Sequence, residues 1–227
     1  MKTIVIKLSG KIFGMENTKT LKDYARFLAL YSKRYRLVVV AGGGKIARHY
    51  ITHARSSGAD ESSLNQLGID VSRLNAQLLI YALKNKAYPH PPTTLHEIKN
   101  AVDGRQIVVT GGLHPGTGTN GTAALIAEKI SASEFINATD VDGVYDLDPN
   151  KYPKAKKFSR INIKDLKNIL IHEDSMAGGY DLMDIVALKI IERSQIKTRI
   201  VKADLKILEK VITGKSTSGT IITPTQK

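Results

Sequence analysis

The sequence predicts an α/β protein, a three-layer sandwich in which a mainly parallel central sheet has helices on both faces. Short apolar runs that suit buried strands alternate with longer stretches in which apolar residues recur every three or four positions. Strand–helix alternation of this kind is typical of parallel sheets covered by helices. Two of the strand-to-helix junctions are also rich in glycine, and ligands of open α/β sheets bind at such junctions.

The first strand–helix–strand unit lies within residues 3–41. Residues 3–8 (TIVIKL) form an apolar run with one lysine, which predicts a buried strand. Residues 21–32 carry apolar side chains at helical spacing and predict a helix, for which Asn17 or Thr18 is a suitable cap. Residues 37–41 (LVVVA) are short and rich in β-branched side chains, so we expect a second strand.

Glycine-rich junctions mark the next part of the chain. The first, residues 42–44, precedes an expected helix over residues 45–55. A longer helix is expected over residues 64–83, where one face carries Leu67, Val71, Leu74, Leu78 and either Tyr81 or Ala82. The remaining elements expected here are a strand at 107–110, a glycine-rich loop ending at Gly121, a helix at 122–130 and a strand at 135–138.

The amino-acid composition changes after residue 139. Residues 140–160 are rich in Asp, Pro, Gly and Lys and predict a long loop or a hairpin. Beyond them we expect helices at 163–171, 182–194 and 205–211, and strands at 198–201 and 220–223. No composition break suggests a linker, so residues 1–227 are predicted to form a single domain with two lobes, about 1–130 and about 131–227.

Composition indicates a globular protein of the cytoplasm. Of the 227 residues, 42% are hydrophobic and 24% charged, enough for one large domain with a buried core. Cysteine is absent, which excludes disulfides and thiolate metal sites and suits a reducing compartment. Because the N-terminal apolar run is too short for a signal peptide and no segment approaches a membrane span, we expect a cytoplasmic location and no membrane partner.

The net charge of +13 leaves two interpretations open. Clustered basic residues would indicate nucleic-acid binding, whereas a lysine-rich surface also suits a protein that binds small anions. The basic residues are scattered apart from one cluster between Lys151 and Arg160, and no zinc-finger or RNP pattern accompanies them. We therefore do not expect nucleic acid to be the main partner, and a non-catalytic nucleotide- or RNA-binding regulator remains an alternative.

The two glycine-rich junctions are candidate phosphate sites. Helix N-termini present unpaired N–H groups and a partial positive charge, and glycine lets an anion approach the backbone. Two such sites in one parallel sheet suggest two phosphorylated groups held together. Lys7 lies at the end of the first strand, before Ser9 and Gly10, where its ammonium either reaches water or meets an anion.

Other motifs carry less weight. Gly214-Lys215-Ser216 lacks the earlier glycine of a Walker A loop. Residues 116–121 fit G-x-G-x-x-G, but five residues separate them from the preceding strand, so a dinucleotide-binding dehydrogenase is only a minor alternative. His49 and His53 have helical spacing without a third metal ligand, and no metal site is predicted from protein side chains.

A segment after the fourth strand carries the resemblance to a known family. Residues 139–149 read Thr-Asp-Val-Asp-Gly-Val-Tyr-Asp-Leu-Asp-Pro, which resembles the ATP loop of the amino-acid-kinase superfamily, T-D-V-D-G-V-Y-x-x-D-P. The opening Lys-Leu-Ser-Gly, the Gly-Gly-Gly-x-x-x-Arg of residues 42–48, and Asp184 occur in the order of that superfamily. The short length, the Arg-Leu-Asn-Ala run at 73–76 and the glycine–threonine loop before Thr122 are similar to its uridylate kinases, particularly the compact archaeal form.

The resemblance implies an enzyme that moves the γ-phosphoryl group of ATP onto UMP. Lys7 would stabilise the transition state, and Asp184 would orient Lys7. Mg²⁺ would arrive with ATP. ATP would contact Lys7, Leu8, Ser9, Gly10, Gly44, Arg48, Thr139, Tyr145 and Asp148. UMP would contact Gly43, Asn65, Leu113, His114, Pro115, Gly116, Thr117, Gly118, Thr119 and Asn120. The lobe before residue 130 would then bind the acceptor and the later lobe ATP.

Two residues depart from the uridylate kinase pattern, which usually has Asp where this chain has Asn65 and Asn120. Asparagine keeps the size and hydrogen bonding of Asp but removes a charge and adds a donor. Beside an anionic acceptor the change at Asn120 is electrostatically favourable. At Asn65 the change weakens the acceptor geometry toward ribose or base.

The resemblance also implies assembly and regulation. Uridylate kinases are commonly hexamers built on dimers, so the helix at 64–83 would supply either an interface or simple core packing. UTP is expected to compete with UMP by its shape. A small-acid kinase acting on acetylglutamate or carbamate is the alternative within the superfamily, although residues 175–180 lack the Gly-Met-x-x-Lys pattern expected for its cationic clamp.

Overall fold

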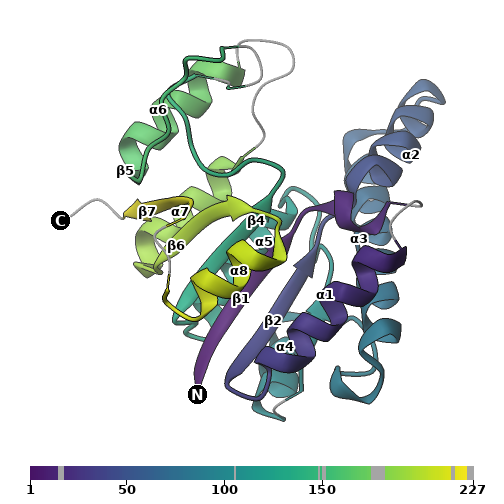
Figure 1. Ribbon diagram of the computed structural model, residues 1–227. Helices are drawn as coiled ribbons and strands as arrows, with labels where there is room; N and C mark the ends of the chain where they lie inside the picture. Colours follow the sequence, from purple (N-terminus) through teal and green to yellow (C-terminus); the bar gives the residue numbers. More distant parts are fainter. Residues whose placement is uncertain are drawn as a thin grey trace.

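The computed structural model describes residues 1–14, 18–104, 106–147, 149, 152–174, 182–215 and 218–223. At its centre is a seven-stranded sheet with the strand order β3-β2-β1-β4-β6-β7-β5 (Figure 1). The strands are β1 (Lys2–Leu8), β2 (Tyr35–Ala41), β3 (Val108–Thr110), β4 (Glu134–Thr139), β5 (Arg160–Asn162), β6 (Thr198–Lys202) and β7 (Thr220–Thr223). Neighbouring strands run parallel except β6 and β7, which confirms the expected mainly parallel sheet.

Helices cover both faces of the sheet, so the expected three-layer sandwich is also confirmed (Figure 1). They are α1 (Thr18–Tyr31), α2 (Gly44–Ser56), α3 (Glu61–Leu83), α4 (Leu95–Asp103), α5 (Thr119–Lys129), α6 (Ile163–Asp174), α7 (Ile185–Ser194) and α8 (Leu205–Ile212), with short 3₁₀ turns η1 (Gly10–Phe13) and η2 (Lys84–Lys86). No helix in the described parts of the chain is long and apolar enough to cross a membrane.

Alternate residues of the central strands face different layers. Val5 of β1 belongs to the core with α4, α5 and α7, whereas Ile4 and Ile6 belong to the core with α1, α3 and α8. The helix α2 packs against α3, and the two extend beyond the sheet as an arm (Figure 1). The carboxyl ends of the strands therefore lie between this arm and the part of the chain that carries β5 and α6.

Two elements occur where the sequence analysis expected none. The helix α4 begins with a capping arrangement, in which the Thr94 hydroxyl accepts a hydrogen bond from the N–H of Glu97 at 3.1 Å. The Glu97 carboxylate in turn accepts one from the N–H of Thr93 at 2.9 Å. A Thr-x-x-Glu spacing is visible in the sequence, so α4 had a usable signal. The strand β5 had none, because it depends on pairing with the distant β7.

Four helix starts were also placed wrongly. The helices α1 and α3 begin at Thr18 and Glu61, each three residues before the expected start. The helix α5 begins at Thr119 rather than at residue 122, so the glycine-rich loop is shorter than expected. The helix α7 begins at Ile185 rather than at residue 182, because Asp184 is its N-cap.

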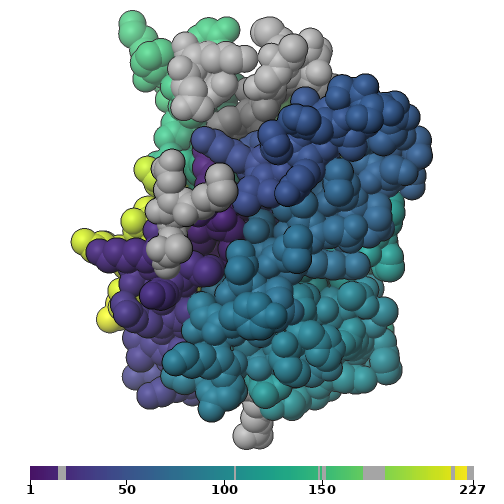
Figure 2. All heavy atoms as spheres, turned by 90° about the vertical axis from the view of Figure 1, so that its right-hand side faces the viewer, coloured from purple at the N-terminus to yellow at the C-terminus, as the bar shows by residue number. Residues whose placement is uncertain are grey.

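The apolar stripe expected on α3 lies only in part on the core side of that helix, where Val71 is buried. Leu74, Leu78 and Tyr81 are 65%, 47% and 68% exposed, whereas Leu79 and Ile80, on the other side, are buried. Periodicity misleads here because α3 has apolar residues on two sides, and spacing alone does not say which side meets the sheet. Figure 2 shows the outer side, where α2 and α3 in blue run beside α1 in purple.

Candidate active site

A cleft of about 520 Å³ opens at the carboxyl ends of β1, β2 and β4. Its floor comes from Lys7 of β1, the residues that follow β1, β2 and β4, and the start of α5. One wall is the arm of α2 and α3. The cleft lies where ligands of open α/β sheets are expected to bind.

Two glycine loops cross at the floor of the cleft. A Cβ atom on Gly10 would lie 2.1 Å from the backbone nitrogen of Gly44, and one on Gly44 would lie 2.5 Å from the carbonyl oxygen of Gly10. Gly44 also has a φ of +67°, which L side chains rarely adopt. Only glycine at both positions lets the loops after β1 and β2 meet backbone to backbone.

Three polar residues of α3 hold the glycine loops in place. The amide of Asn75 donates to the carbonyl oxygen of Gly42 at 2.8 Å. The Ser72 hydroxyl accepts the N–H of Gly112 at 2.8 Å, and Arg73 donates to the carbonyl oxygens of Gly112 and Leu113 at 3.0 and 3.1 Å. Two of these residues belong to the Arg-Leu-Asn-Ala run, and their role here is to fix the backbone around the cleft.

Two helices that border the cleft begin without a side-chain cap. The N-cap residues of α2 and α5 are Gly43 and Gly118, and neither supplies a capping hydrogen bond. By contrast, α3, α4, α7 and α8 all begin with an Asp or Thr whose side chain accepts from the first turn. A helix whose N-cap residue makes no such bond leaves N–H groups and a partial positive charge available to an anion, although in α5 the N–H of Gly121 is already bonded to the Asp184 carboxylate. Both expected phosphate sites therefore open into one cleft.

Lys7 enters this cleft from the end of β1. In the sheet it lies beside Val40 of β2 and Asn137 of β4, and by strand alternation it faces the same layer as Val5, the layer of α5 and α7. The buried Asn137 donates to the carbonyl oxygen of Leu182 at 2.7 Å. A buried polar side chain, held by a hydrogen bond, thus lies beside Lys7 in the sheet.

Asp184 lies just behind the start of α5. Its carboxylate accepts the N–H of Gly121 in α5 at 3.0 Å and the N–H of Ala187 in α7 at 2.7 Å. A Cβ atom on Gly118, which lines the cleft, would lie 3.2 Å from this carboxylate. Asp184 therefore ties two helix N-termini together at the edge of the cleft, where their dipoles favour its negative charge.

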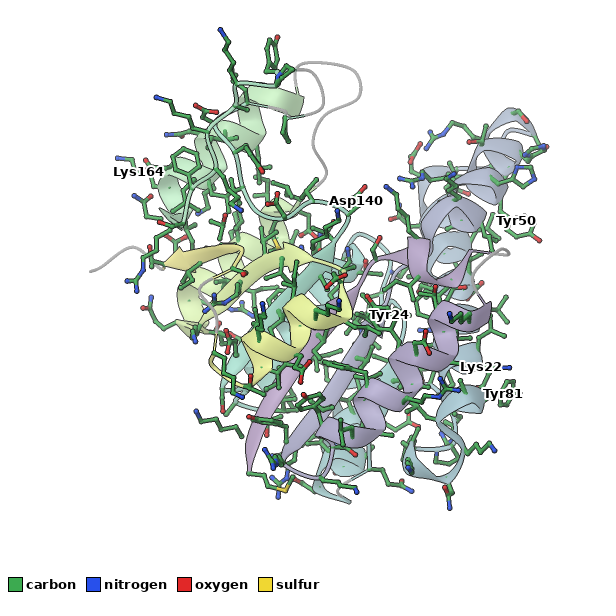
Figure 3. The ribbon with its side chains drawn as sticks, viewed as in Figure 1. Lys22, Tyr24, Tyr50, Tyr81, Asp140 and Lys164 are labelled. Carbon is green, nitrogen blue, oxygen red and sulfur yellow. The ribbon has the colours of Figure 1, made fainter. Side chains whose placement is uncertain are left out.

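An ion pair closes the edge of the cleft on the β4 side. The Lys11 ammonium bonds to the Asp140 carboxylate, which also accepts from the Thr139 hydroxyl at 3.0 Å. Partial burial acts to raise the pKa of Asp140, but the hydrogen bonds from Lys11 and Thr139 outweigh it, so the pKa lies below its ordinary value. Figure 3 places Asp140 at the upper end of the sheet, between the α2 arm and the α6 side.

The loop beyond β4 has a second, similar cluster. Asp142 accepts from Lys157 at 2.8 Å and from the Tyr145 hydroxyl at 2.7 Å. Burial acts to raise the pKa of Asp142, yet these two bonds hold it below its ordinary value. The bond to Asp142 is also the main reason why the pKa of Tyr145 is raised. These hydrogen bonds therefore join Asp142, Tyr145 and Lys157 within the loop.

Comparison with known proteins identifies the family. The model of the amino acid kinase family matches residues 2–202. The chain belongs to this family. It is 44% identical over 222 residues to a uridylate kinase of Hyperthermus butylicus, covering 97% of each chain. It is 40% identical over 224 residues to that of Sulfolobus acidocaldarius, covering 97% of this chain and 99% of the relative.

Solved structures agree with this membership. The crystal structure of a uridylate kinase from Archaeoglobus fulgidus matches with a TM-score of 0.87 at 38% identity, covering 98% of this chain and 100% of that one. A UMP kinase from Bacillus anthracis, at 22% identity and a TM-score of 0.83, shares the fold. Within the amino acid kinase family the chain therefore groups with the uridylate kinases and is a phosphotransferase. The small-acid kinase and the non-catalytic regulator are not favoured.

The cleft of this amino acid kinase collects many of the residues that the resemblance assigned. Those that line it are Lys7, Ser9, Gly10, Gly43, Gly44, Arg48, Asn65, Thr117, Gly118, Thr119 and Thr139. They come from the ends of β1 and β4, from both glycine-rich junctions and from the arm. The assigned donor and acceptor residues thus share one space.

Other assigned residues lie outside the cleft lining. Leu8, Leu113 and Asn120 are buried beneath it, and the Asn120 amide donates to the carbonyl oxygen of Leu182 at 3.4 Å. Their side chains therefore brace the site in this conformation instead of facing a ligand. The loop residues His114, Pro115 and Gly116 are exposed but are not among the lining residues, nor are Tyr145 and Asp184. Asp148 lies outside the described residues.

The cleft also contains residues that the sequence analysis did not assign. On the arm, Ala47, Ile51, Leu64 and Ile69 form an apolar wall. Apolar residues give no sequence signal that separates a ligand wall from the core. Lys11 and Asp140 did carry a signal, since one follows the Ser-Gly pair and the other lies inside the 139–149 motif.

Proposed function

We propose that this protein catalyses the transfer of the γ-phosphoryl group of ATP to UMP, giving UDP and ADP. The observation that carries the proposal is the convergence of Lys7 and two glycine-started helices, α2 and α5, on one cleft. Such a site seats two phosphate groups close together with a cation beside them, as phosphoryl transfer requires. The uridylate kinase relatives support UMP as the acceptor.

The residues divide between donor and acceptor. The donor half consists of Lys7, Ser9, Gly10 and Thr139, with the lobe after residue 130 holding adenosine. The acceptor half consists of the start of α5 and the arm, where the apolar wall suits the flat face of a pyrimidine and Asn65 supplies a polar group, whereas Arg48 of the arm belongs to the donor half. The lobe before residue 130 would provide most of this half.

The chemistry needs no strong base, because the phosphate of UMP is already an oxyanion at neutral pH. Lys7 would neutralise charge that builds up on the transferred group, and the glycine loops would fix both phosphates by backbone N–H groups. Asp184 would hold the start of α5 and orient Lys7. Mg²⁺ carried by ATP would neutralise the donor phosphates, held mainly through phosphate oxygens.

The decisive experiment measures ADP release with Mg-ATP and a panel of acceptors, namely UMP, CMP, dCMP, acetylglutamate and carbamate. We expect UMP to give the highest kcat/KM. Preference for CMP or for either acid would overturn the acceptor assignment. Salt-sensitive RNA binding without turnover would instead favour a regulator.

Lys7→Ala tests the mechanism in the same assay. Loss of one preorganised donor is expected to lower kcat on the order of 10²–10³-fold with little change in the KM of UMP. Unchanged turnover in this variant would contradict the role of Lys7.

The same proposal has a cellular side. UDP is a precursor of other pyrimidine nucleotides, so we place the reaction in pyrimidine nucleotide biosynthesis and the protein in the cytoplasm, where ATP and UMP are held by their charge. UTP would compete with UMP because it shares the uridine that the acceptor half recognises. Inhibition by UTP that does not weaken as the UMP concentration rises would contradict this competition.

We further propose that the protein assembles into a homo-oligomer, a hexamer by analogy with its family. The support in this chain is the outer side of α3, where Leu74, Leu78 and Tyr81 are exposed and the last two border a surface hollow of about 640 Å³ between α1 and α3. Figure 3 shows Tyr81 pointing away from the molecule. Exposed apolar groups that gather in this way are typical of association surfaces.

A further inference from the structure

Lys11 is the first residue after the Ser9-Gly10 pair and one of the basic groups that line the cleft. Its ammonium reaches from η1, which follows β1, to Asp140, which follows β4. Since β1 and β4 are neighbours in the sheet, the pair spans the edge of the cleft directly beside the strand end that carries Lys7.

The two partners differ in how firmly they are held. Asp140 is bonded by the Thr139 hydroxyl, and the backbone of Thr139 is fixed because its carbonyl oxygen accepts the N–H of Ala203 at 2.6 Å. The Lys11 side chain is long and 51% exposed. The carboxylate is therefore anchored, and the Lys11 side chain is long and exposed enough for its ammonium to reach an anion in the cleft.

A purely structural role for this pair is a weak explanation. Both side chains are about half exposed, and ion pairs of that kind add little to stability. The position matters more, because a carboxylate at the edge of a site for polyphosphate repels the ligand unless a cation is paired with it. Lys11 supplies that cation in the free protein.

We propose that Lys11 is a second phosphate-binding lysine of the donor half, held in place by Asp140 until the phosphates of ATP take over its ammonium. Lys11 is then a contact residue, and Asp140 is a positioning residue that also competes with the nucleotide for the same cation. This inference rests on the proposed function, since it assigns Lys11 to the ATP side of that reaction.

The proposal predicts effects of opposite sign for the two partners. Lys11→Gln removes a charge-assisted contact and should raise the Kd of ADP, measured by calorimetry without UMP, about tenfold. Asp140→Asn removes the competing carboxylate and should lower that Kd about threefold. Lys11→Arg keeps the charge and should recover most of the affinity. In kinetics, Lys11→Gln should raise the KM of ATP and leave the KM of UMP unchanged.

A matched pair outside the cleft provides the control. Lys167 bonds to Glu192 at 2.7 Å, and neither residue lines the cleft. Lys167→Gln and Glu192→Gln break an ion pair of the same kind and should leave the Kd of ADP unchanged. Thermal unfolding of all variants identifies any that fail to fold. If Lys11→Gln fails to fold, the ADP affinity of Lys11→Arg is compared with that of Asp140→Asn instead.

The outcomes separate the inference from the proposed function. Equal losses of ADP affinity in Lys11→Gln and Asp140→Asn would overturn the inference, because a structural pair loses the same bond in both. Unchanged ADP affinity in Lys11→Gln would overturn it as well, even if the protein phosphorylates UMP. A protein that shows the opposite effects on ADP binding but no activity with UMP would support the inference and contradict the acceptor assignment. A folded protein that binds no ADP would contradict both.

Discussion

Asp184 illustrates how one side chain serves two parts of the site. Its carboxylate satisfies the N–H of Gly121 in α5 and the N–H of Ala187 in α7, so it fixes the start of the helix that we assign to the acceptor phosphate. A negative charge favoured by two helix N-termini is also suited to hold a nearby lysine. Structural and mechanistic roles of this residue can be separated by comparing two substitutions.

Asp184→Ala should lower the free energy of unfolding by about 1–2 kcal/mol, because two N–H groups lose their partner. Asp204→Ala is the matched control, since Asp204 also accepts two N–H groups but both belong to the exposed start of α8, so its loss should cost less. Asp184→Asn keeps an acceptor oxygen and should be closer to wild type in urea denaturation, yet its kcat should fall if Asp184 orients Lys7 by its charge, as we propose. Full turnover in the Asn variant would show that Asp184 acts as a cap alone.

Asn65 is a residue whose side-chain hydrogen bonding could not be predicted from the sequence. The resemblance raised the concern that asparagine weakens an acceptor position at this site. In the structure the Asn65 amide nitrogen donates to the carbonyl oxygen of Glu61 at 2.7 Å within α3. The donor that distinguishes Asn from Asp is therefore used inside the helix, and the remaining oxygen is left as the acceptor. The sequence could not reveal this, because the bond depends on the rotamer.

Among the elements, α3 organises the cleft more than its sequence pattern indicates. One side packs on the sheet, one side carries the exposed apolar residues, and its polar residues hold both glycine loops. Buried hydrogen bonds to loop backbone are costly to remove, because the partner group is left without a bond. Removing the hydroxyl of Ser72, the smallest of these side chains, should therefore lower the stability measurably.

Ser72→Ala should lower the free energy of unfolding by about 1–3 kcal/mol, because the buried N–H of Gly112 loses its acceptor. The loop after β3 should also become less ordered, so the KM of UMP should rise. Ser56→Ala removes an exposed hydroxyl that bonds to the carbonyl oxygen of His53 and should change stability by less than about 0.5 kcal/mol. Urea denaturation of the two variants checks the first part, and steady-state kinetics checks the second. Equal stability of the two variants would contradict the proposed role of Ser72 in holding the loop after β3.

The elements that could be predicted from the sequence share one property, which is that local pattern decides them. The central strands and the glycine-started helix α2 combine clear periodicity with clear boundaries, and from these the sheet, its layers and the position of the cleft follow. Elements that depend on distant partners were missed or placed wrongly. The strand β5 needs β7, and the core side of α3 is set by the sheet that it meets. The Lys11–Asp140 pair likewise joins residues that are far apart in the chain.

At the scale of the whole molecule, the paired carboxylates make stability depend on acidity. Folding lowers the pKa values of Asp140 and Asp142, so the folded state favours their ionised forms. This contribution is present above the unfolded pKa of about 4 and is lost as the pH falls through the lower folded values. We expect the urea midpoint to fall as the pH drops below about 4. Asp142→Asn should make that fall shallower while reducing stability at neutral pH; a parallel pH profile in the variant would contradict the assignment.

The outer side of α3 should decide whether the chain exists as a monomer. Leu74 and Tyr81 are among the most exposed large apolar residues described, and lysines placed there would meet each other across a symmetric contact. Leu74→Lys combined with Tyr81→Lys should therefore reduce the mass measured by light scattering to that of a smaller species. The matched control, Leu147→Lys, changes a half-exposed leucine on the far side of the cleft and should leave the mass unchanged. If the double variant keeps the wild-type oligomer, or if the wild-type protein is already a monomer, the apolar side of α3 is not an interface between copies of this chain.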